Sequence, residues 1–172
     1  MEQNLIAQVQ YGDQDAFELL ISPYVQPIFN YIAFRVPDAA DANDILQETM
    51  LSIWQSIKSF QHDSSFKTWA FTIARRRLAD FYRNKKVDNV PLDDNLRAED
   101  GLPDSITRMD ISAALSKLSD DESELVHLIF HSQLSYKEVS ELLNIPVGTI
   151  KSRMSGIKSK LKKLIGGGYN GL

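Results

Sequence analysis

The chain of 172 residues contains no cysteine, which excludes a disulfide framework and any metal site built on thiolates. It also lacks an uninterrupted apolar stretch of about 20 residues, the length that a membrane-spanning helix requires. The first residues, Met-Glu-Gln-Asn-Leu-Ile, show neither the basic start nor the apolar run of a secretory signal. We therefore expect a soluble cytoplasmic protein that is not inserted into a membrane.

The motifs of common enzyme classes are missing as well. There is no phosphate-binding loop of the P-loop type and no nucleophile elbow. His127 and His131 are four residues apart, a spacing at which two helical histidines can share a metal. No third ligand is near them in the sequence, and no His-Glu-x-x-His pattern occurs. We expect no catalytic activity, no metal and no cofactor.

Strand-like alternation of apolar and polar residues is also lacking. Apolar residues recur at helical spacing instead, which predicts an all-α fold. The expected helices cover about residues 2–36, with a break near Gly12, and then 41–58 and 66–86. Ser65 is the expected cap of the helix over 66–86. Further helices are expected from about residue 108 and over 119–131, the last opened by a capping box of Ser119 and Glu122.

Residues 87–107 interrupt the helical periodicity. They contain two prolines, one glycine and six acidic residues without a sustained apolar period, as flexible linkers do. The sequence therefore predicts two small helical domains, 1–86 and 108–165, joined by this acidic linker. A glycine-rich flexible tail is expected at 166–172.

The net charge of −4 is distributed unevenly along the chain. Residues 61–86 hold seven basic and two acidic side chains, and residues 125–172 hold the same numbers. The segments 1–60 and 87–124 are acidic. Two separated basic blocks predict two electropositive surfaces, and local fields of this kind govern association with nucleic acid more than the net charge does.

The second basic block contains a helix-turn-helix pattern over residues 135–163. Ser135 and Glu138 form a capping box that starts a helix at Tyr136. Asn144 and Pro146 end this helix, and a second one begins near Val147 or Gly148. A short helix, a tight turn and a longer basic helix are typical of a reader of duplex DNA.

The second helix of this pattern has three kinds of surface. Its apolar side carries Ile150, Met154, Ile157, Leu161 and Leu164. Its opposite side carries the small residues Ser152, Ser155, Gly156 and Ser159. The edges carry Lys151, Lys158 and Lys162 on one flank and Arg153 and Lys160 on the other. A small-residue face fits a major groove while the edge cations reach phosphates. The alternative is a solvated lysine fringe, but no acidic residue follows Glu141 to neutralise it.

The helix expected over 66–86 is similarly divided. Its apolar arc carries Phe66, Trp69, Ala70, Ile73, Ala74 and Phe81, and we interpret Trp69 as a core residue. The opposite strip carries Thr72, Arg75, Arg76, Arg83 and Lys86, with Lys67 and Lys85 nearby. Clustered cations beside an aromatic-bearing loop suit single-stranded nucleic acid. Arg77 lies on the apolar side, so we expect an internal ion pair with Asp80.

The helix expected over 41–58 carries the opposite charge. Its outward face holds Asp44, Glu48, Leu51 and Gln55, with Asp41 and Gln47 beside them. No lysine or arginine occurs between Arg35 and Lys58, so the helix cannot neutralise these carboxylates itself. An acidic face with an apolar centre predicts a docking surface for a basic partner. The alternative is an ordinary solvated face.

These three surfaces, in this order, resemble the extracytoplasmic-function group of bacterial RNA polymerase sigma factors. The resemblance is carried by residues 41–54 (Asp-Ala-Asn-Asp-Ile-Leu-Gln-Glu-Thr-Met-Leu-Ser-Ile-Trp), by 65–80, and by 134–154 with its Ile-Pro-Val-Gly-Thr-Ile-Lys-Ser-Arg-Met end. It covers essentially the whole chain. It implies a subunit that binds core RNA polymerase and directs initiation at promoters through their −10 and −35 elements.

The resemblance also implies roles for particular residues. Asp44, Gln47 and Glu48 would grip the clamp helices of the largest polymerase subunit. The loop 59–66 would admit an unstacked base of the −10 element, and the helix after it would hold the separated strand with Lys67, Arg75, Arg76 and Arg83. The residues nearest the −35 element would be Thr149, Lys151, Ser152, Arg153 and Ser155. The acidic linker would run toward the RNA exit path, and an anti-sigma protein is a further implied partner.

A helix-turn-helix regulator that binds duplex DNA without polymerase is the main alternative. It accounts for residues 135–163 but gives the acidic face and the arginine strip no role. Copurification with core polymerase distinguishes the two hypotheses, because only a sigma factor is expected to copurify and to direct run-off transcription.

Overall fold

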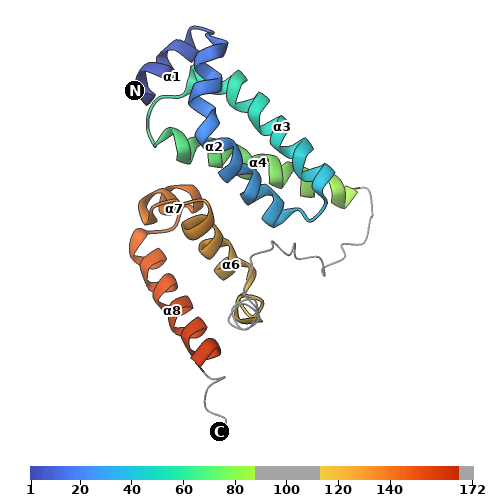
Figure 1. Ribbon diagram of the computed structural model, residues 1–172, viewed down its shortest axis with the longest axis vertical. Coiled ribbons are helices and arrows are strands. Elements are labelled where there is room, and N and C mark those ends of the chain that lie inside the picture. Colours follow the sequence, from blue (N-terminus) through green and yellow to red (C-terminus); the bar gives the residue numbers. More distant parts are fainter. Residues whose placement is uncertain (88–112, 167–172) are drawn as a thin grey trace. The chain divides into compact units, whose positions relative to one another are not determined.

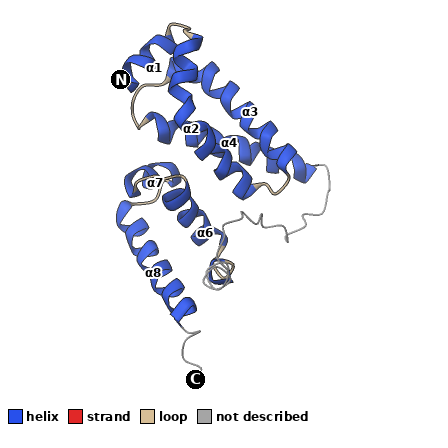
Figure 2. Cartoon of the chain, in the orientation of Figure 1, coloured by secondary structure: helices blue, strands red, loops and turns tan. Residues whose placement is uncertain are grey.

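The computed structural model describes residues 1–87 and 113–166, and this part of the chain contains helices and turns but no strand (Figures 1 and 2). The expectation of an all-α fold is confirmed. The chain divides into two compact units, Met1–Ala98 and Glu99–Leu172. The expected linker at 87–107 and tail at 166–172 lie almost entirely outside the described residues, so the expected domain boundaries stay predictions.

Over residues 1–87, the first unit is a bundle of four helices and one short 3₁₀ turn (Figure 1). Its elements are α1 (Glu2–Gln10), α2 (Gln14–Arg35), α3 (Ala39–Ser56), η1 (Ile57–Ser59) and α4 (Phe66–Val87). The expected break between α1 and α2 is present. Gly12 has a φ of 98° there, which a side-chain-bearing residue rarely adopts, and the Asp13 carboxylate accepts a hydrogen bond from the Ala16 amide at 3.0 Å.

Side-chain caps also fix where α3 and α4 begin. Helix α3 starts at Ala39, slightly earlier than expected, because the Asp38 carboxylate accepts from the Asp41 amide at 2.9 Å. At the start of α4, the Ser65 hydroxyl accepts from the Thr68 amide at 3.1 Å, as expected. These caps stabilise the starts of α3 and α4.

The core of the first unit forms where α2, α3 and α4 pack together. Its largest fully buried side chains are Tyr31, Phe66, Phe71, Ile6, Ile28, Ile32, Ile53 and Ile57. The rings of Tyr31 on α2 and Phe71 on α4 lie 5.8 Å apart. At the far end of α4, the Tyr82 hydroxyl donates to the Arg35 carbonyl at the end of α2. The burial of Tyr82 raises the pKa of its phenol, so the hydroxyl keeps this proton.

The second unit contains α6 (Asp120–Val126), the π-helical turn η2 (His127–His131), α7 (Tyr136–Leu143) and α8 (Val147–Gly166). Both expected capping boxes are present, Ser119 with Glu122 and Ser135 with Glu138. The helix expected to reach His131 does so, but its last turn is wider than an α-helix.

The turn between α7 and α8 depends on one residue. Asn144 adopts the left-handed conformation with a φ of 55°, and its backbone N–H donates to the Ser140 carbonyl. Beyond the turn, α8 buries Ile150, Met154 and Ile157, as its periodicity predicts, whereas Leu161 and Leu164 are half-buried. The helix-turn-helix therefore has the expected layout.

We expect Asn144→Ala to destabilise this turn by about 1 kcal/mol, because alanine disfavours the left-handed region. Asn144→Gly is the matched control and should retain the stability of the parent, since glycine adopts this conformation freely. Thermal unfolding of the full chain, together with amide hydrogen exchange in α7 and α8, measures both effects. Equal exchange rates in the two variants would show that the backbone conformation at this position does not limit stability.

Candidate functional site

The outward side of α3 carries the residues expected to bind a basic partner, which we call the carboxylate face: Asp41, Asp44, Gln47, Glu48, Leu51 and Gln55. Asp44, Glu48 and the two glutamines are exposed, and Leu51 is 55% exposed. The opposite side of the same helix buries Ala42, Ile45, Thr49 and Ile53. The burial of that apolar side fixes the carboxylate face toward solvent.

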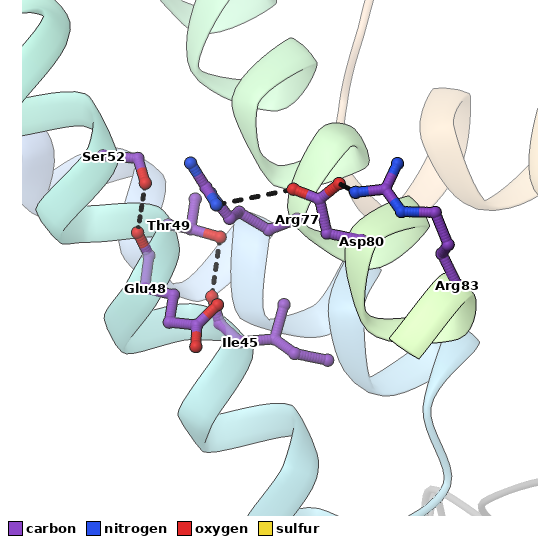
Figure 3. A network of polar contacts seen from close by, with 7 residues as sticks. All are labelled: Ile45, Glu48, Thr49, Ser52, Arg77, Asp80 and Arg83. Carbon is purple, nitrogen blue, oxygen red and sulfur yellow. Dashed lines mark hydrogen bonds and ion pairs between the residues drawn. The ribbon is translucent and has the colours of Figure 1, made fainter. Parts of the chain in front are cut away.

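Hydroxyl groups along α3 are satisfied within the helix. Thr49 is fully buried and donates to the Ile45 carbonyl at 2.7 Å, and Ser52 donates to the Glu48 carbonyl at 2.6 Å (Figure 3). These bonds engage backbone carbonyls and do not occupy the Glu48 carboxylate. Neither Asp44 nor Glu48 has an ion pair among the described residues.

Asp41 differs from these two acids. Its carboxylate pairs with Lys85 of α4 at 3.2 Å, and the Lys85 ammonium also lies 5.1 Å from the centre of the Phe81 ring. The expectation of an acidic face without cationic partners is therefore wrong at Asp41. The sequence argument considered only cations within α3, whereas the partner comes from a helix that follows it in the chain and packs against it.

A groove of about 490 Å³ separates the carboxylate face from α4. It is lined by Asp41, Asp44, Ile45 and Glu48 of α3 and by Arg77, Asp80, Phe81, Arg83 and Asn84 of α4. The Asp80 carboxylate accepts from Arg77 at 3.4 Å through one oxygen and from Arg83 at 2.6 Å through the other (Figure 3). The expected pair of Arg77 with Asp80 exists, although both side chains are partly exposed rather than internal.

The expected arginine strip follows the outer side of α4. Arg75, Arg76 and Arg83 are exposed, and Lys67 and Thr72 are half-buried. The Thr72 hydroxyl donates to the Thr68 carbonyl at 2.9 Å. Arg83 is turned into the ion pair with Asp80, so the strip and the groove share this arginine. Lys86 belongs to α4, but its side chain lies outside the described residues.

An aromatic cluster underlies the loop before α4. The Trp69 ring is half-buried and packs 5.0 Å from Phe60 and 5.8 Å from Phe66, which agrees with its interpretation as a core residue. His62 lies in this loop with a φ of 62°, and its exposed ring is 4.7 Å from Phe60. The sequence argument gave His62 no role, because its place on the cluster depends on the loop conformation.

The residues expected to face duplex DNA all lie on the solvent side of α8. Thr149, Lys151, Ser152, Arg153, Ser155 and Lys158 are exposed. Gly148 and Gly156 of this helix meet no atom within 4 Å of where a Cβ would lie. The packing of the protein does not require glycine at either position, and both keep the surface of the helix smooth.

The edge of α8 is not wholly without acidic partners, contrary to expectation. The Lys160 ammonium donates to Glu122 of α6 at 2.7 Å, and Arg153 lines a groove of about 350 Å³ beside Asp121 and Glu122. The hydrogen bond from Lys160 is the main cause that lowers the pKa of Glu122, followed by the bond from the Ser119 amide. Lys151 and Lys158 have no ion pair within the described part of the chain.

The two histidines of η2 lie against each other. Their rings stack 4.9 Å apart with an interplanar angle of 13°. Burial, and to a smaller extent the charge of His131, lower the pKa of His127 to about 4, so His127 is neutral near pH 7. Over residues 1–87 and 113–166, no group of three or more side chains is arranged to hold a metal ion.

Known proteins resemble this chain over most of its length. Family models of Sigma-70 region 2 and Sigma-70 region 4 match residues 20–87 and 108–161. The ECF RNA polymerase sigma factor SigW of Bacillus subtilis is 31% identical over 92% of this chain and 93% of its own length. This chain belongs to the extracytoplasmic-function group of sigma-70 factors. EcfG of Rhodopseudomonas palustris is 33% identical over 81% of the chain and 80% of its own length.

Two solved structures share the fold. The sigma factor RpoE of Bartonella quintana, solved with the anti-sigma factor NepR, has a TM-score of 0.67 and 26% identity, covering 87% of this chain and 96% of its own. CnrH, solved with the cytosolic domain of CnrY, has a TM-score of 0.68 over 96% of this chain and 97% of its own, and at 22% identity it supports the fold alone.

Membership of this group establishes what the protein does. It is a sigma factor that binds core RNA polymerase and directs promoter-specific initiation of transcription, with core polymerase and promoter DNA as its partners. Sigma factors are regulatory initiation factors rather than enzymes. No helix in the described ranges has the length and apolar character needed to cross a bilayer.

The pair of Glu122 with Lys160 predicts a pH-dependent contribution to stability. Because the pKa of Glu122 in the folded protein is below its ordinary value of 4.5, this contribution is complete above that pH and is lost as the pH falls through the lowered pKa. Urea unfolding should therefore find Glu122→Gln less stable than the parent near pH 7, with the difference shrinking as the pH falls below 4.5.

Lys160→Met is the matched control, since it removes the amine and leaves the capping box intact. In this background, Glu122→Gln should produce a much smaller pH-dependent change. A difference that is independent of pH would mean that the charge of Glu122 does not contribute to stability, and would contradict the prediction.

Proposed function

We propose that this sigma factor docks on core polymerase through Asp41, Asp44, Gln47, Glu48, Leu51 and Gln55. Exposed carboxylates around a central apolar side chain are suited to a partner surface that offers cations around an apolar pocket. The observation that carries the proposal is that Asp44 and Glu48 have no ion pair among the described residues while Leu51 lies exposed beside them. We assign Asp41 a smaller part, since Lys85 already neutralises it.

The upstream promoter element is read by α8. We assign phosphate contacts to Lys151, Arg153 and Lys158 at the helix edges, and groove contacts to Thr149, Ser152 and Ser155. The exposure of all six supports this assignment. Hydroxyl side chains on a smooth helix surface allow the helix to lie deep in a major groove.

The downstream element is opened by α4 and the loop before it. Lys67, Thr72, Arg75, Arg76, Arg83 and Lys86 are assigned to the separated strand. Binding of unpaired bases offsets part of the cost of melting, so the step requires no hydrolysis. The exposed cationic strip of α4, next to a loop built on an aromatic cluster, supports this assignment.

The assignment also concerns location and regulation. We infer that the factor acts in the cytoplasm, where polymerase and promoter DNA meet, and that it has no catalytic activity of its own. An anti-sigma protein is a further proposed partner, because the Bartonella quintana relative was solved with one. Residues 1–86 are proposed as the domain that binds polymerase and the −10 element. Residues 108–165 are proposed as the domain that binds the −35 element.

The wild-type protein should copurify with bacterial core polymerase and direct run-off transcription from templates of a randomised promoter library. Asp44→Lys with Glu48→Lys should abolish both, because the reversed charges would repel the cationic partner. The control, Asp15→Lys with Glu18→Lys, makes the same charge change at two exposed sites of α2 and should leave binding intact. Core binding that survives the α3 substitutions would refute the docking role.

Lys151→Ala with Arg153→Ala should weaken binding to upstream duplex DNA and reduce the dependence of log K on log salt by about one unit for each phosphate that is no longer bound. Lys58→Ala with Lys117→Ala removes two exposed cations elsewhere and should leave the slope unchanged. Electrophoretic mobility shift with holoenzyme over a salt series measures both. An unaltered slope in the α8 variant would place the phosphate contacts on other residues.

A further inference from the structure

Arg83 belongs to two surfaces that have different partners. Its position on α4 aligns it with Thr72 and Arg76 of the arginine strip, which is assigned to the promoter strand. Its guanidinium, however, lines the groove that faces the carboxylate face of α3. The residue that holds it there is Asp80, at 2.6 Å.

The two arginines that bind Asp80 differ in how exposed their side chains are. Arg77 bonds one carboxylate oxygen and is 39% exposed, and its buried Nε has no acceptor within the described part of the chain. Arg83 bonds the other oxygen and is 73% exposed. Because the two bonds use separate oxygens, Arg83 can leave Asp80 without breaking the bond that orients the carboxylate through Arg77. Figure 3 shows Asp80 between the two guanidinium groups.

The charge around this groove favours retention of Arg83 in the free protein. Four carboxylates line it, from Asp41, Asp44, Glu48 and Asp80, against two arginines. Lys85 neutralises Asp41 from outside the groove lining, but Asp44 and Glu48 remain uncompensated within the described chain. An arginine held beside these carboxylates experiences a negative potential that opposes its transfer to a phosphate.

We propose that Asp80 is a positioning residue that couples polymerase binding to capture of the promoter strand. In the free protein it holds Arg83 on the groove side. When cations of core polymerase neutralise Asp44 and Glu48, the potential that retains Arg83 is weakened, and Arg83 turns to the strand. This proposal rests on the proposed docking of polymerase at the carboxylate face.

The coupling has a thermodynamic form that can be measured. If polymerase raises the affinity of the factor for the single strand by a certain ratio, the strand must raise the affinity for polymerase by the same ratio. We call this ratio the coupling ratio. Part of it should decay with ionic strength, because the interaction between exposed charges is screened over about 10 Å at 0.1 M salt.

The experiment measures the coupling ratio by fluorescence anisotropy at low salt. The probe is a fluorescein-labelled single strand spanning the −10 element of the most active promoter selected from the randomised library, titrated with the free factor and with holoenzyme. Asp80→Asn should raise the affinity of the free factor about two- to fivefold, the range of one partly exposed ion pair, and leave that of holoenzyme unchanged. The coupling ratio should fall by the same factor.

Further variants separate positioning from structure. Arg83→Gln should lower the affinity of holoenzyme for the single strand and leave that of the free factor unchanged. It therefore also reduces the coupling ratio, but through holoenzyme rather than through the free factor. Asp80→Glu retains the charge and should restore the ratio. Glu18→Gln removes one exposed carboxylate of α2 and controls for net charge. An unchanged ratio in Asp80→Asn, or an equal gain in both states, overturns the proposal.

These outcomes are distinct from failure of the proposed function. If the wild-type factor does not bind core polymerase or selects no promoter, the proposed function is refuted. If it does both and Asp80→Asn leaves the coupling ratio unaltered, only the positioning role is refuted.

Discussion

The packing of α3 against α4 is the interaction on which the first unit depends. Ile45 and Ile53 of α3 and Phe71, Ala74 and Leu78 of α4 are buried. Because each helix must bury its apolar side, the charged sides of both are directed toward solvent and meet along a shared groove. The proposed docking surface and the proposed strand-binding surface are thus consequences of one packing arrangement, and their opposite charges are held close together by the core beneath them.

The second unit holds a cationic helix, α8, with most of its charged side chains exposed. Helix α8 is anchored by Ile150, Met154 and Ile157 on one side only. Two capping boxes and the left-handed Asn144 fix the starts of α6 and α7 and the angle of the turn. The contact between Lys160 and Glu122 adds one tie between α8 and α6. Lys151, Arg153 and Lys158 are exposed on the solvent side, where we propose that they contact DNA.

Local signals account for most of what the sequence predicted. Capping at Ser65, Ser119 and Ser135 is decided by residues three positions apart, so these helix starts were predicted from the chain itself, whereas the caps at Asp13 and Asp38 were not identified. Periodicity likewise identified the faces of α3, α4 and α8. It could not identify which neighbouring helix each face meets, so the pairs of Asp41 with Lys85 and of Glu122 with Lys160 escaped the sequence argument. The π-helical turn escaped it too, since its wider bonding pattern leaves no clear periodic signature over five residues.

Gly156 of α8 lowers the stability of the helix but leaves its surface free of a side chain. Nothing in the described protein crowds this position, and glycine in a helix interior costs about 1 kcal/mol relative to alanine. Selection for a sturdier fold alone would favour a methyl group there. The chain instead keeps a bare stretch of backbone on the exposed side of α8, the side that we assign to DNA, so no side chain holds a groove away from the helix at this position.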